Sequence, residues 1–156
     1  VAHPGPSYLR LGKAGEPVFH ADVPSVAPGA WLEVAAAPSR AGEPVFVTTG
    51  AALAVALARF ERGEGRAVYS LPLWSQAVKA GQAATVAGFG AVETHEDHLV
   101  DGGFGSWLLE AVAVAEPTSA SRVRIRALDP LVCGTVGSQA TLNRIGGLGF
   151  DEGQRR

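Results

Sequence analysis

The chain has 156 residues, of which 47% are hydrophobic and 18% charged, and its formal net charge is −2. This length fits one ordinary domain, and the composition is that of a globular protein rather than a disordered one. Because the charge is slightly negative and no long basic or apolar run occurs, we expect no nucleic-acid partner and no membrane partner.

Cys133 is the single cysteine, so the chain can form no internal disulfide. This usage favours a reducing compartment, and we expect a cytoplasmic protein. The sequence contains no methionine and opens at Val1, which indicates a processed start or a piece of a longer protein.

Residues 1–44 are rich in proline and contain two short strand candidates, at 7–11 and 31–34. From residue 45 the pattern becomes periodic. The apolar and β-branched run 45–49 predicts a strand buried on both faces. Residues 51–61 then show helical spacing of their apolar side chains, and 67–71 predict a second strand.

The second half continues this alternation. We expect a short helix at 75–79, a strand within 85–94, and a helix over 104–115 whose apolar face repeats at the helical period. Residues 122–127 alternate arginine with apolar residues, which predicts an edge strand with one exposed face. A last short helix with a serine N-cap is expected at 138–145.

Strands that alternate with helices predict an α/β fold of three layers, in which a mostly parallel (mixed) sheet of about five strands lies between helices. We assign residues 44–150 to this domain and 151–156 to a mobile tail. In such sheets the loops at the carboxyl ends of the strands carry the binding surface.

The stretch 94–107, THEDHLVDGGFGSW, lies at this edge of the predicted sheet. We expect a strand over 89–94, a polar turn, a double glycine, and a helix that begins at Phe104. Glycine permits backbone angles and close approaches that a side chain forbids. The first N–H groups of the helix would face whatever occupies the loop.

A metal site is one interpretation of the acidic and histidine side chains at 95–98, together with Asp101. The two histidines stand one residue closer together than in the His-Glu-x-x-His pattern, which places two ligands on one helical face. We therefore predict polar packing at an interdomain or intersubunit surface, and no metal site.

A hydrolase site is a second interpretation, with Ser106 as nucleophile, His98 as base and Asp101 orienting it. The residues around Ser106 lack the Gly-x-Ser-x-Gly elbow that exposes a nucleophilic serine. We therefore predict no catalytic residue in this chain.

Anion binding is a third interpretation, because bare helix N-termini attract anions. The stretch lacks the phosphate-loop pattern, and tight turning would also explain its glycines. The candidate residues for an interface or an anion site are Glu96, His98, Gly102, Gly103, Phe104 and Ser106.

The same stretch resembles the C-terminal domain of transketolase-type thiamine-diphosphate enzymes. In those proteins a strand that ends in a Val-Glu-Asp/Glu-His-like run precedes a Gly-Gly-Phe-Gly-Ser helix start. The run VFVTTG at 45–50 is similar to the opening of that domain, and the resemblance covers roughly residues 44–150. Residues 5–12 look like the last strand of the preceding pyrimidine-binding domain, so 1–43 would be the end of that domain plus a Pro-rich linker.

The family includes transketolases, deoxyxylulose-phosphate synthases and the beta subunits of 2-oxoacid dehydrogenases. The resemblance implies two-carbon ketol transfer between sugar phosphates by the full assembly. In the family, thiamine diphosphate and its magnesium lie between the two preceding domains, and the catalytic glutamate belongs to the pyrimidine-binding domain. This chain alone would therefore bind neither cofactor and would be inactive.

The resemblance also implies partners: the missing thiamine-binding domains or a partner subunit, in a homodimer or a hetero-oligomer. In the family this domain supports dimerisation and borders the substrate entrance, which would place Glu96, His98, Gly102 and Gly103 at the intersubunit contact. Two alternatives from the residues themselves are a free-standing anion- or nucleotide-sensing domain that uses Gly102-Gly103, and an oligomerisation domain without a ligand.

Overall fold

A computed structural model of the chain describes residues 17–149. The strand expected at 7–11 and the tail expected at 151–156 lie outside the described residues. Within 17–149, no helix combines the length and the apolar character that crossing a bilayer requires.

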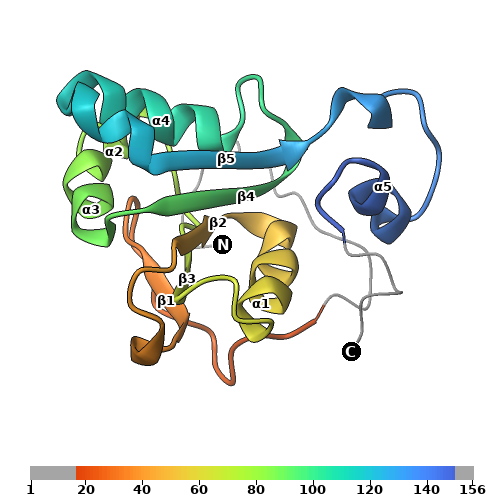
Figure 1. The fold of residues 1–156 in the computed structure, drawn as a ribbon, viewed down its shortest axis with the longest axis horizontal. Helices are drawn as coiled ribbons and strands as arrows, with labels where there is room; N and C mark the ends of the chain where they lie inside the picture. Colours follow the sequence, from red (N-terminus) through yellow and green to blue (C-terminus); the bar gives the residue numbers. More distant parts are fainter. Residues whose placement is uncertain (1–16, 150–156) are drawn as a thin grey trace, which may run out of the picture.

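The described residues form a five-stranded sheet with helices on both faces, which confirms the predicted three-layer α/β class (Figure 1). The strand order is β1-β3-β2-β4-β5. β1 runs antiparallel to β3, and the other neighbouring strands are parallel. The strands are β1 (Leu32–Ala36), β2 (Val45–Thr48), β3 (Ala67–Ser70), β4 (Val92–Leu99) and β5 (Val123–Leu128).

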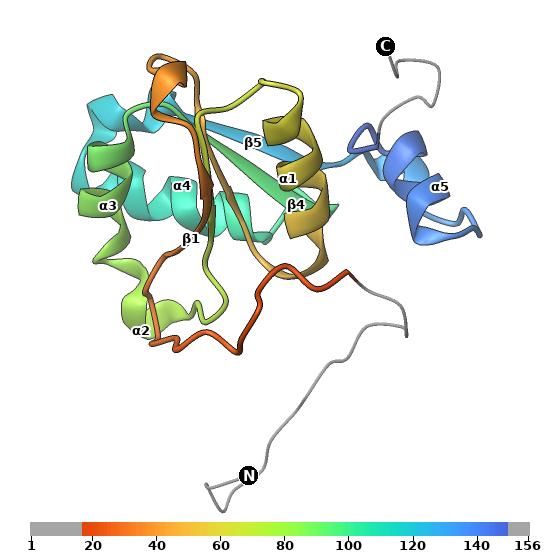
Figure 2. The same ribbon diagram turned by 90° about the horizontal axis from the view of Figure 1, so that it is seen from below.

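The α-helices lie on opposite sides of the sheet. α1 covers one face, whereas α3 and α4 cover the other, and α5 lies apart from the sheet beyond the end of β5 (Figure 2). The α-helices are α1 (Leu53–Glu61), α2 (Gln76–Lys79), α3 (Gln82–Phe89), α4 (Phe104–Ala115) and α5 (Gln139–Ile145). Short 3-10 turns are η1 (Pro38–Arg40), η2 (Gly50–Ala52), η3 (Pro117–Arg122) and η4 (Pro130–Val132).

β2 lies in the middle of the sheet, and all four of its residues are buried. Because successive side chains of a strand point to opposite faces, Val45 and Val47 enter the core under α4 while Phe46 packs against α1. The uninterrupted apolar run at 45–49 therefore reflects burial on both sides, as expected.

Aromatic side chains fill the core between the sheet and α4. Phe104 is fully buried, and its ring centroid lies 6.2 Å from that of Trp31, 5.6 Å from that of Trp74 and 6.0 Å from that of Trp107. Trp31 also donates a 2.7 Å hydrogen bond to Gln82 Oε1 at the start of α3. The segment before β1 is thus fastened to the helical layer.

The structure corrects the predicted start of a strand and the predicted start of the domain. The strand expected within 85–94 begins only at Val92, because residues 82–89 form α3, which ends at Gly90 with a positive φ of 75°. The predicted domain start at residue 44 also divides the sheet. β1 pairs with β3, so the domain includes residues that we had assigned to the linker.

Candidate functional site

β4 carries buried polar side chains on both of its faces. Glu93 and His95 face α1, whereas Thr94 and Glu96 face α4, as the alternation of a strand requires. All four are at least 96% buried. The polar turn expected at 95–98 is therefore wrong: His95 pairs with Thr48 of β2, and Leu99 still pairs with Leu128 of β5.

Glu96 joins the end of the sheet to the start of α4. Both of its carboxylate oxygens lie 3.2 Å from the backbone N of Gly105, which donates to them from the first turn of the helix. His98 Nδ1 lies 3.1 Å from Glu96 Oε2. Burial raises the pKa of Glu96, while the Gly105 N–H and the nearby His98 oppose that rise. We call Glu96, His98, Gly102, Gly103 and Gly105 the glycine corner.

The glycines of this corner are required for two different reasons. A Cβ atom at Gly103 would lie 2.3 Å from Glu96 Oε2, and one at Gly105 would lie 2.6 Å from Thr94 Oγ1 and 2.8 Å from Glu96 Oε1. Gly102 has open space around it, but its φ of 69° falls in the left-handed region. Two glycines make room for the carboxylate, and one turns the chain.

The structure brings the predicted candidates together but leaves few of them accessible. Glu96, Gly103 and Phe104 are buried, and Phe104 belongs to the aromatic core. Ser106 donates to the carbonyl of Val100 and so holds the loop against the helix. His98, with 41% of its side chain exposed, the partly exposed Ser106 and the exposed Gly102 are the candidates that a neighbouring molecule could touch.

The position of Glu96 bears on the anion-binding interpretation. The N–H of Gly105 already donates to a carboxylate of the same chain. An external anion would have to displace that carboxylate or lie beside its charge, which costs free energy in a site shielded from water. The geometry therefore favours a corner that is closed by the protein itself.

The hydrolase and metal interpretations gain no support from the arrangement. The hydroxyl of Ser106 is hydrogen-bonded to the carbonyl of Val100, and His98 Nδ1 faces Glu96 rather than the serine. Among residues 17–149, no three His, Cys, Asp or Glu side chains are grouped so that they could hold a metal ion.

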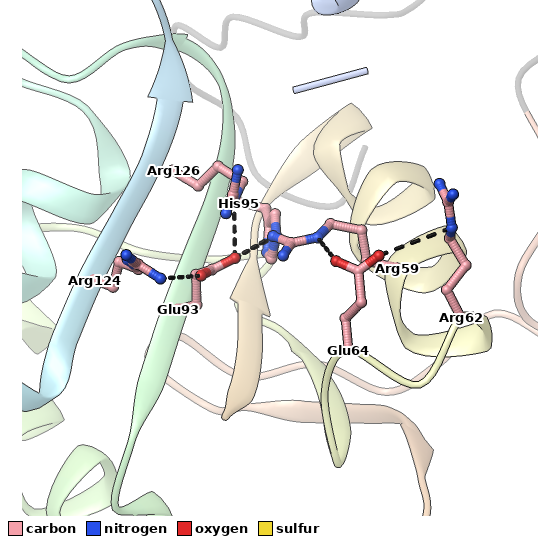
Figure 3. Close-up of polar contacts among 7 residues, drawn as sticks. All are labelled: Arg59, Arg62, Glu64, Glu93, His95, Arg124 and Arg126. Atoms are coloured by element: carbon pink, nitrogen blue, oxygen red, sulfur yellow. Dashed lines mark hydrogen bonds and ion pairs between the residues drawn. The ribbon is translucent and has the colours of Figure 1, made fainter. Parts of the chain in front are cut away.

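On the opposite face of β4, Glu93 is the centre of an arginine network (Figure 3). Arg59 of α1 donates to Glu93 Oε1, and Arg126 Nε of β5 lies 2.9 Å from the same oxygen. Arg124 Nη1 lies 3.8 Å from Oε2, and Arg59 Nε also donates to Glu64 at 2.7 Å. Burial alone would raise the pKa of Glu93, but the hydrogen bond from Arg126 and the positive charges of Arg59 and Arg126 hold it well below its ordinary value.

His95 lies beneath this network as a neutral ring. Its Nε2 is 2.8 Å from Arg59 Nη1 and 3.3 Å from Glu93 Oε1. Since a guanidinium can only donate, Nε2 accepts the bond from Arg59 and the ring proton lies on Nδ1. Burial lowers the pKa of His95, and the neighbouring Glu93 carboxylate offsets only part of that effect.

Sequence reasoning missed this network and Gly105. The alternation of Arg122, Arg124 and Arg126 was interpreted as one exposed face, whereas the Arg126 side chain is only 34% exposed and bonds Glu93. The detectable signal was a glutamate in a central strand of the same sheet, because a buried carboxylate needs a cationic partner.

Comparisons with known proteins agree with the observed fold. The chain matches no protein-family model and no curated protein. Among solved structures it is similar to a chain described as a split gene transketolase, inactive beta4 tetramer, with a TM-score of 0.63 and 20% sequence identity. The match covers 86% of this chain but only 43% of the other. The chain therefore has a transketolase-like fold and spans less than half the length of that transketolase chain.

The neutral His95 predicts a pH dependence of stability. Its pKa is lower in the folded than in the unfolded state, so the unfolded chain binds more protons around the ordinary value of 6.5. The contribution of His95 to the free energy of unfolding is then fully present above that value and is lost as the pH drops through and below it.

Urea denaturation at a series of pH values measures this loss, which we expect to be smaller in His95→Gln. The matched control His20→Gln, before β1, should keep the wild-type profile, and an unchanged profile in His95→Gln would contradict the assignment.

Proposed function

We propose that the chain is the C-terminal domain, or a separate subunit, of a transketolase-like thiamine-diphosphate enzyme that transfers two-carbon ketol units between sugar phosphates. The observation that supports this most is the fold likeness over 86% of the chain to a split gene transketolase, of whose length the chain accounts for 43%. We infer a cytoplasmic location from the single cysteine.

The glycine corner supports a structural role within that assembly. Its hydrogen-bonding groups already have partners within the chain. The N–H of Gly105 donates to the carboxylate of Glu96, and the hydroxyl of Ser106 donates to the carbonyl of Val100. What the corner presents outward is the turn Val100–Gly102 and the half-exposed His98. This surface is suited to contact with a neighbouring subunit and to forming part of the substrate-entrance rim, rather than to bond making.

The described residues do not fit the cofactors of the family. A diphosphate at the N-terminus of α4 would meet the carboxylate of Glu96, which already accepts from Gly105. No group of acidic or histidine side chains within 17–149 is arranged for a cation such as magnesium. We therefore assign thiamine diphosphate and magnesium to the domains outside this chain.

Titration calorimetry with thiamine diphosphate and magnesium tests that assignment. We expect no saturable heat from the isolated 156-residue chain, and both binding and ketol transfer after co-expression with a polypeptide that carries the thiamine-binding domains. Circular dichroism of the isolated chain confirms that it is folded during the titration. Tight cofactor binding, or turnover of a ketose by this chain alone, would show that the proposal is wrong.

The interface role of the corner is tested by sedimentation over a range of concentrations. If His98 and the turn Val100–Gly102 contact a second subunit, Asp101→Arg should weaken self-association about tenfold or more, because it reverses a charge within the contact. Val114→Lys changes an 87% exposed residue at the opposite end of α4 and serves as the control. If both variants associated equally, or if the chain were monomeric at every concentration, the proposed dimerisation role would be wrong.

A further inference from the structure

A cavity of about 520 Å³ opens at the edge of the sheet opposite the glycine corner. Its walls come from the end of β1, the loop after η1, the start of β3 and the turn between α3 and β4. These segments meet there because the amino ends of the parallel strands share one edge, and Ala36 of antiparallel β1 pairs with Ala67 of β3. This volume lies in the range of small-molecule sites.

The charged groups at this cavity are mainly acidic. Glu33 and Glu43 line it together with the guanidinium of Arg66, so the carboxylates outnumber the cation. Arg66 Nη2 donates to the carbonyl of Phe89 at 2.5 Å, which holds the guanidinium against the backbone. A carboxylate of Glu33 accepts from Tyr69 Oη at 2.5 Å. Its second oxygen has capacity for another donor.

Two aromatic rings lie in the apolar wall of the same cavity, beside alanines and a proline. The rings of Tyr69 and Phe89 have centroids 4.6 Å apart at an interplanar angle of 33°. The pairing of β1 with β3 shifts register between Glu33 and Ala35. Irregularities of this kind on edge strands re-aim side chains and are frequent beside binding sites. The hydrogen bond to Glu33, together with burial, raises the pKa of Tyr69, so its hydroxyl stays a donor to that carboxylate.

We propose that this cavity binds an organic cation, a protonated amine attached to a small aromatic or apolar body. The ammonium group would lie against the free oxygen of Glu33, and the body would pack on the Tyr69 and Phe89 rings. Aromatic faces and carboxylates attract cations, whereas an anion would meet the two glutamates. The site is separate from the glycine corner, and it goes beyond the proposed function.

The test uses three probes of one shape and different charge: benzylamine, which is protonated at neutral pH, neutral benzyl alcohol and anionic benzoate. Each is titrated into the full chain while the backbone amide resonances are followed by NMR. We expect benzylamine to shift the amides of Ala36, Ala37 and Gly90 saturably in the millimolar range or below. Benzyl alcohol should bind roughly tenfold more weakly and benzoate not at all.

Matched variants locate the interaction. Glu33→Gln should weaken benzylamine binding about two- to fivefold, because it removes the charge of an exposed carboxylate and keeps the side-chain shape. Glu61→Gln makes the same charge change on α1, across the sheet, and should leave binding unchanged. The proposal is overturned if the three probes bind equally, if benzylamine does not saturate or shifts other amides, or if Glu33→Gln binds as the wild type does.

Discussion

The carboxylate of Glu96 is the contact on which the geometry of the glycine corner depends. It lies within β4, and both of its oxygens accept from the Gly105 N–H in the first turn of α4. The positive end of a helix dipole and a buried carboxylate stabilise each other, since each lacks water. This contact is possible only because Gly103 and Gly105 have no side chain, so the glutamate and the glycines act as one unit.

The same strand uses a second buried carboxylate differently. Glu93 is neutralised by arginines from α1 and β5, whereas Glu96 is held by a backbone N–H and by the partly exposed His98. The pKa values of the two groups accordingly move in opposite directions. Together they fasten β4 to α1, to β5 and to α4, so a strand full of charged residues lies inside the sheet rather than in a turn.

Periodicity predicted the elements whose burial is simple. The helix at 104–115 and the buried strand at 45–48 follow directly from where the apolar side chains fall. α3 was missed because its residues are mostly alanine, glycine and other small side chains, which give no clear stripe, and because Gly88 and Gly90 suggested interruption. The polar half of β4 was missed since its burial depends on partners from distant elements, which a local pattern does not contain.

In the candidate site, too, the local sequence pattern indicates some features, whereas others depend on contacts between distant elements. The motif drew attention to a stretch in which Glu96, His98 and Gly103 lie in contact, but it did not indicate that Glu96, Gly103 and Phe104 would be inaccessible. Only the three-dimensional contacts reveal that the N–H of Gly105 is already occupied. That occupancy is the reason for preferring a corner that the protein closes itself over an anion sensor.

Amide hydrogen exchange at Gly105 tests this account most directly. A backbone N–H that donates to a buried carboxylate should exchange slowly in the wild type. In Glu96→Ala that protection should be lost, and the free energy of unfolding should fall by about 1–3 kcal/mol, the cost of leaving a buried donor unpaired. If the Gly105 amide of the wild type exchanged as fast as an exposed loop, or kept its protection without Glu96, the carboxylate would not be what closes the corner.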